Sequence, residues 1–109
     1  MKNSTIKFDI VLDQNKHPEK IEWMASDSGM EGMKAAKAIL LSVWDEKEPG
    51  TLRIDLWTKE MMVEEMQRFI YDTMNSLAST YANATNDEVL SKELRDFSTS
   101  FGKKAGVIS

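Results

Sequence analysis

Cysteine is absent from the 109 residues of this chain, and proline and histidine are scarce, with two prolines and one histidine. The lack of cysteine excludes disulfides, thiolate metal sites and a cysteine nucleophile, so packing and backbone hydrogen bonds must hold the fold. No stretch approaches the roughly 20 apolar residues that span a bilayer. The N-terminus alternates apolar with charged residues instead of forming the apolar core of a signal peptide. We therefore expect a cytoplasmic protein without direct membrane insertion.

Concentrated charge and catalytic groupings are also missing. The net charge of −4 is spread over the chain without a basic block, which argues against nucleic acid as a partner. The single histidine, His17, precedes Pro18 in a polar segment, as expected for a solvated turn rather than a general base or metal ligand. The glycines form no phosphate-cradling motif. The sequence therefore predicts no enzyme, no catalytic residue, no metal and no cofactor.

What the sequence does contain is strand-like alternation in its first half. Apolar and charged residues alternate over Thr5 to Leu12, and a second short strand follows Pro18. If the two form a hairpin, Ile10 lies opposite Ile21 and Phe8 opposite Trp23, which puts both apolar stripes on one face.

Two further strands are predicted after a glycine-containing connection over Asp27 to Ala36. The third strand, Lys37 to Trp44, is apolar on both faces, as expected for an interior strand. A Pro-Gly turn then leads to the fourth strand, and pairing Trp44 with Thr51 aligns their apolar residues. The predicted core pairs are Val43 with Leu52, Leu41 with Ile54 and Ile39 with Leu56.

The second half changes to helical periodicity. From Met62 the apolar residues recur at the spacing of a helix of about five turns. The segment Thr85 to Glu88 fits a capping box that starts a second helix. Strands followed by helices predict an α+β fold, namely a four-stranded antiparallel sheet followed by two C-terminal helices packed on one face. We expect one domain over residues 1–109.

The other face of the sheet is the candidate site. Once Ile39, Leu41 and Val43 face the helices, the alternate residues must point away from them. Exposed aromatic groups beside apolar neighbours mark interaction surfaces, although they also lie over aliphatic stems on solvated sheets. The candidate partner-binding residues are Met24, Leu40, Trp44, Arg53, Asp55 and Trp57.

Several segments carry a family resemblance that covers nearly the whole chain. These are IKFDIVLDQN, PEKIEW, LLSVWD, LRIDLWTKEM and LRDF, and the joint occurrence of LSVWD and LRIDLWTK is the most specific feature. Together they resemble the GldC family of gliding-motility-associated proteins. The resemblance implies a small cytoplasmic protein of Bacteroidetes-type bacteria, and it brings no catalytic residues.

Three functions of different classes remain in view. The first is an accessory interaction protein, a cytoplasmic adaptor whose tryptophan-bearing face binds a protein of the gliding or secretion machinery, or a second copy of the chain. The second is a holdase similar to SecB, because SecB-type chaperones share the order of four strands and two helices. An enzyme or small-ligand binder ranks third.

Overall fold

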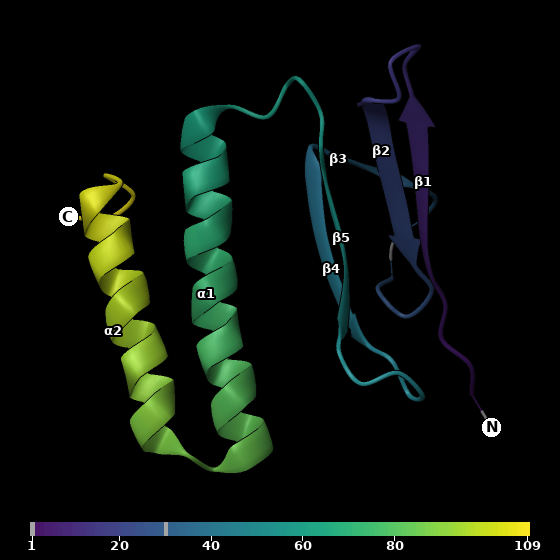
Figure 1. Ribbon diagram of the computed structural model, residues 1–109. Coiled ribbons are helices and arrows are strands. Elements are labelled where there is room, and N and C mark those ends of the chain that lie inside the picture. The colour runs from purple at the N-terminus through teal and green to yellow at the C-terminus, as the bar shows by residue number, and fades with distance from the viewer. Residues whose placement is uncertain (1, 30) are drawn as a thin grey trace. The chain divides into compact units, whose positions relative to one another are not determined.

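The computed structural model describes residues 2–29 and 31–109 (Figure 1). Over these residues the chain forms five strands followed by two helices, which confirms the α+β class. It divides into two compact units, a strand unit (Met1–Met61) and a helical unit (Met62–Ser109). The predictions of a single domain and of helices packed on the sheet stay predictions. The elements are β1 (Ile6–Leu12), β2 (Pro18–Ala25), β3 (Lys34–Ala36), β4 (Ala38–Trp44), β5 (Thr51–Trp57), α1 (Val63–Thr85) and α2 (Glu88–Lys104).

The single four-stranded sheet predicted from the sequence is wrong. The strands form two antiparallel sheets, one of order β1-β2-β3 and one of β4-β5. The predicted third strand, Lys37 to Trp44, is confirmed as β4, and a short strand that was not predicted, β3, precedes it. Between β3 and β4, the Lys37 carbonyl accepts a hydrogen bond from the Thr58 amide at 2.8 Å. β3 pairs with β2 and β4 pairs with β5, so the chain switches sheets at Lys37 (Figure 1). The expected connection over residues 27–36 therefore ends in a strand, β3.

Both predicted hairpin registers are confirmed. In the first, Phe8 lies opposite Trp23 and Ile10 opposite Ile21. In the second, Trp44 lies opposite Thr51, and the three predicted aliphatic pairs follow. Side-chain parity along a strand has a period of two, so these registers also fix which residues share a face.

The buried centre of the strand unit lies on β2 and not on β4. Ile21 is 1% exposed, whereas Ile39 and Leu41 are half-buried and Val43 is exposed. The central strand of a three-stranded sheet has neighbours on both sides, and Ile21 pairs with Ile10 and Ala36. The expected core face of β4 and β5 is therefore not buried by the strand unit itself.

Local capping explains the ends of the helices. The Met62 amide donates to the Glu65 carboxylate at 3.0 Å where α1 begins. Asn86 takes a left-handed conformation, and its amide closes α1 onto the Ala82 carbonyl at 2.8 Å. Asp87 then caps α2 by accepting a hydrogen bond from the Leu90 amide at 3.1 Å.

No helix in the described part of the chain is long and apolar enough to cross a membrane.

Small residues form the seam between α1 and α2. Ser91 and Ser98 of α2 are fully buried, as is Ala78 of α1. The Ser91 hydroxyl donates to the Ala78 carbonyl at 2.8 Å. Gly102 is buried so close to Tyr71 that a Cβ at position 102 would lie 2.7 Å from two atoms of the ring. Because small side chains allow the two backbones to approach closely, the larger apolar side chains remain on the flank of the helical pair.

Candidate interaction surfaces

One face of the β4–β5 hairpin carries both predicted tryptophans, and we call it the tryptophan face. Trp44 and Trp57 are 70% and 55% exposed. Trp57 pairs with Ala38, at the opposite end of β4 from Trp44. At about 3.3 Å per residue, these seven residues separate the two rings by roughly 20 Å. The face therefore has two separate aromatic ends. Its members are Ala38, Leu40, Ser42, Trp44, Thr51, Arg53, Asp55 and Trp57.

An ion pair occupies the middle of this face. Nη2 of Arg53 lies 3.0 Å from Oδ1 of Asp55, and both side chains are about half exposed. Leu40 pairs directly with Asp55 and is half-buried. Met24 belongs to a different surface, because it lies on β2 of the other sheet and pairs with Lys7. The structure thus brings together five of the six candidate residues.

The opposite face of the same hairpin is wholly aliphatic, and we call it the aliphatic face. Leu52, Ile54 and Val43 are each close to half exposed or more, so the strand unit does not cover them. The sequence assigned this face to the core. Its members are Ile39, Leu41, Val43, Leu52, Ile54 and Leu56.

A hollow of about 420 Å³ lies where β5 ends, beside the β1–β2 turn. Trp57 and Asp55 of the tryptophan face line it, together with His17 and Lys59 from outside that face. Thr58, which also lines it, is 5% exposed, and its hydroxyl has no hydrogen-bond partner among the described residues. The sequence alone gave no signal for this hollow, because its walls come from segments that share no pattern.

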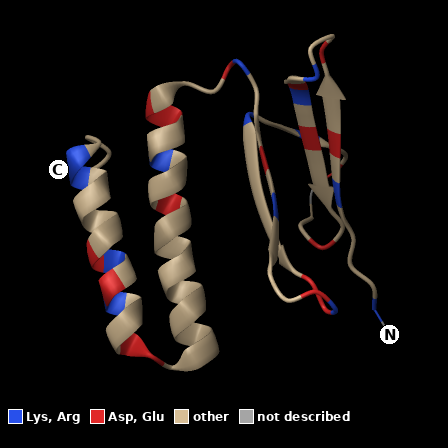
Figure 2. Ribbon diagram, in the orientation of Figure 1, with Lys and Arg blue, Asp and Glu red and all other residues tan. Residues whose placement is uncertain are grey.

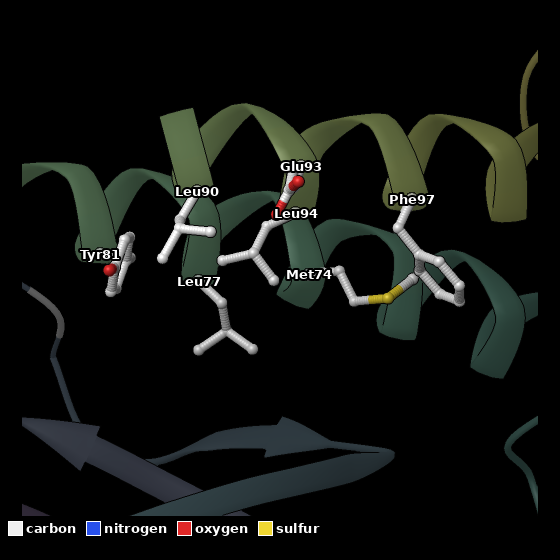
Figure 3. A pocket seen from close by; sticks show the side chains of 7 residues that line it. All are labelled: Met74, Leu77, Tyr81, Leu90, Glu93, Leu94 and Phe97. Carbon is white, nitrogen blue, oxygen red and sulfur yellow. The ribbon is translucent and has the colours of Figure 1, made fainter. Parts of the chain in front are cut away.

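A larger apolar groove runs along the helical unit, and we call it the helical groove. Its volume is about 480 Å³, and Glu93 is its one charged lining residue. Figure 3 shows Leu77 of α1 and Leu90 and Leu94 of α2 pointing to the same side. Phe97, at one end, is 65% exposed. The helical periodicity identified these residues but assigned them to the core. The lining residues are Met74, Leu77, Tyr81, Leu90, Glu93, Leu94 and Phe97.

The only histidine lies in the β1–β2 turn, as the sequence predicts. Oδ1 of Asp13 accepts the amides of Asn15 and His17 at 2.8 and 2.9 Å, which closes the turn. These amides, chiefly that of His17, hold the pKa of the Asp13 carboxyl below its ordinary value. The histidine ring itself is about two-thirds exposed. Nowhere in residues 2–29 and 31–109 do three His, Cys, Asp or Glu side chains come together as metal ligands would.

Charges of both signs are interspersed over the strands and over α2 (Figure 2). The second half of α1, by contrast, carries no charged residue. This uncharged half supplies three residues of the helical groove, namely Met74, Leu77 and Tyr81. The α1 side of the groove therefore carries no charge.

A family model, that of the gliding motility-associated GldC-like proteins, matches residues 18–107. The chain belongs to the GldC-like family. The match begins at β2 and extends past the end of α2, so it includes the tryptophan face and the helical groove. No curated protein and no solved structure matches the chain.

Proposed function

We propose that this chain is a non-enzymatic accessory protein of gliding motility that binds a protein partner through its tryptophan face. In this proposal it acts from the cytoplasm as an adaptor for the motility or secretion machinery. Membership of the GldC-like family supports the process, and the tryptophan face supports the mode of action.

The exposure of Trp44 and Trp57 is the observation that carries the proposal. Both rings stand on the β4–β5 hairpin, and more than half of the surface of each is exposed to solvent. Tryptophan and arginine are enriched among the residues that dominate binding energy in interfaces, and Arg53 lies between the two rings on this face. Truncating such an anchor typically weakens binding by about 2 kcal/mol or more. An exposed ring contributes much less to folding.

The test is a crosslinking pull-down from the native cell with the double variant Trp44→Ala, Trp57→Ala. We expect the partner to be lost while the circular dichroism spectrum and the melting temperature stay close to wild type. Val89→Ala is the control, because Val89 is 74% exposed on α2 and belongs to the helical unit. Unfolding of the double variant, or retention of every partner at wild-type affinity, would contradict the proposal.

The helical groove favours a second function, that of a SecB-like holdase for unfolded clients. A wide apolar groove with one charged lining residue suits extended apolar segments of many sequences. This function predicts that the purified protein suppresses aggregation of unrelated heat-denatured enzymes and that Phe97→Ala weakens the suppression. A specific adaptor gives no suppression, and its partner binding responds to the tryptophan variants instead.

A further inference from the structure

Strand β5 presents a free edge. In the described part of the chain it pairs with β4 alone, so its other side carries unpaired amide and carbonyl groups. Such edges are usually blunted by charged side chains, especially lysine, by proline or by a bulge. β5 contains no lysine or proline, its two charged residues, Arg53 and Asp55, are paired with each other, and its register with β4 runs without a shift over all seven pairs. This edge is therefore a template on which another strand can pair.

The sheet that β5 belongs to is also small. An isolated two-stranded hairpin is marginally stable in water, and three or more strands with an apolar face are needed for independent stability. The β4–β5 sheet has two strands, and Leu52 and Ile54 on its aliphatic face are exposed. Added strands would provide hydrogen-bond partners for the unpaired amide and carbonyl groups of β5. They would also widen the apolar face of the sheet into a surface large enough to be buried.

The residues of β5 are complementary to β5 itself. We infer that two copies of the chain form a symmetric dimer in which their β5 strands pair antiparallel, centred on Ile54. In this register Arg53 of each copy lies opposite the partner's Asp55, and Leu52 lies opposite the partner's Leu56. Opposite charges and aliphatic pairs stabilise facing positions of antiparallel strands. The full strand is used, with Thr51 opposite the partner's Trp57 at both ends.

This register also suits the geometry of the ion pair. Arg53 and Asp55 already meet on the tryptophan face at 3.0 Å. Across the two-fold axis the partner's pair lies on the same face in reversed order, so the four charges alternate in sign. A two-fold interface of this kind is closed and produces dimers rather than fibres. The result is one four-stranded sheet of order β4, β5, partner β5 and partner β4.

β1, an outer strand of the other sheet, also has a free edge, and it is less suitable. A register centred on Phe8 would also place Lys7 opposite the partner's Asp9 and Ile6 opposite Ile10. It uses only residues 6–10 of the strand, however, and the pairing of β1 with β2 shifts between Val11 and Leu12. β1 also belongs to a sheet that already has three strands. Compared with β1, β5 therefore offers a longer segment for pairing with a second copy and belongs to the smaller sheet.

Charge reversal tests the register. Arg53→Glu alone and Asp55→Arg alone each place like charges opposite each other at two positions of the dimer, so each variant should self-associate roughly tenfold more weakly or worse. An equimolar mixture of the two variants should form a heterodimer, because all four charges are then paired between copies. Both single variants lose the ion pair within the strand, so rescue by mixing reports the contact between copies. Sedimentation velocity and native mass spectrometry would measure it.

Lys7→Glu and Asp9→Arg are the matched controls, because they break the equivalent ion pair on β1. They should leave the dimer intact. The inference is overturned if the wild-type chain is monomeric up to its solubility limit, if the β1 variants dissociate the dimer instead, or if mixing the β5 variants restores nothing.

A cysteine scan supplies a second measurement that does not depend on charge. The chain has no cysteine, so Ile54→Cys places one thiol per copy. Facing Cα atoms of antiparallel strands are about 4.5 to 5.5 Å apart, within reach of a disulfide. Val43→Cys is the control, since β4 and the partner's β4 are about 14 Å apart. Mild oxidation should crosslink the first variant and not the second. A monomeric Ile54→Cys product, or equal crosslinking of both, would reject this pairing. The dimer does not rest on the proposed function, and these tests need no cellular partner.

Discussion

Replacement of Ile21 by alanine should destabilise the strand unit more than any other single truncation on its strands. The side chain is 1% exposed at the centre of a three-stranded sheet, with Ile10 and Ala36 facing it. Removing three carbons forfeits about 2.4 kcal/mol of transfer free energy. The methyl group of Ala36 cannot move into the space, so the free-energy cost of the remaining cavity is added to this loss. We expect a total loss of about 3 to 5 kcal/mol in the free energy of unfolding.

Urea unfolding followed by tryptophan fluorescence measures this loss. All three tryptophans lie in residues 1–61, so fluorescence follows the strand unit, whereas ellipticity at the helical wavelength follows mainly α1 and α2. Ile6→Ala is the matched control, because Ile6 is the same residue type, on β1, and 66% exposed. It should cost less than about 1 kcal/mol. Equal midpoint shifts for the two variants would refute the assignment of the buried centre to β2.

Two further predictions concern the helical seam and the turns. Gly102→Ala should lower the free energy of unfolding by up to about 2 kcal/mol. The added methyl group would be overpacked against the Tyr71 ring, and this cost outweighs the gain of about 1 kcal/mol in helix propensity. An unchanged or raised melting temperature would contradict this. Asp13 and Asp45 accept backbone amides, chiefly those of His17 and Glu48, which lower the pKa of both carboxyls. Their contribution to stability is therefore present above the unfolded pKa of about 3.9 and is lost as pH falls through the lowered values. Asp45→Asn should make the acid-side decline of the melting temperature shallower, and an identical decline in variant and wild type would reject the role of this carboxyl.

The hairpin registers could be predicted from the sequence because they depend on local information. Alternation with a period of two, together with the turn at Gly50, leaves one alignment that matches Leu41 with Ile54. The same alternation placed Trp44 and Trp57 on one face. The predicted register also places Trp57 opposite Ala38, at the other end of β4 from Trp44, so the separation of the two rings follows from it.

The short strand β3 and the division into two sheets could not be predicted, because β3 has three residues and no alternation to identify it. The pairing of Ala36 with Ile21 and the hydrogen bond from Thr58 to Lys37 are both long-range contacts. The helical seam was missed for a different reason. Periodicity analysis weighs large apolar residues, whereas the seam is made of serine, alanine and glycine. The spacing of Ser91 and Ser98, seven positions apart, was the one signal available.

The proposed dimer changes what the tryptophan face can bind. Within one copy, Trp44 and Trp57 lie roughly 20 Å apart along the strands, too far to hold one small epitope together. In the Ile54-centred register, Trp44 faces Thr51 of its own copy, and Thr51 faces the partner's Trp57. Two strand spacings of about 4.8 Å then bring tryptophans from different copies within about 10 Å of each other, on the same face and at both ends of the four-stranded sheet. Neither copy alone brings two tryptophans this close together on the tryptophan face. A protein that recognises this tryptophan pair would bind the dimer in preference to the monomer. Self-association through β5 would therefore control the adaptor function, although every residue that the partner contacts is already exposed in the monomer.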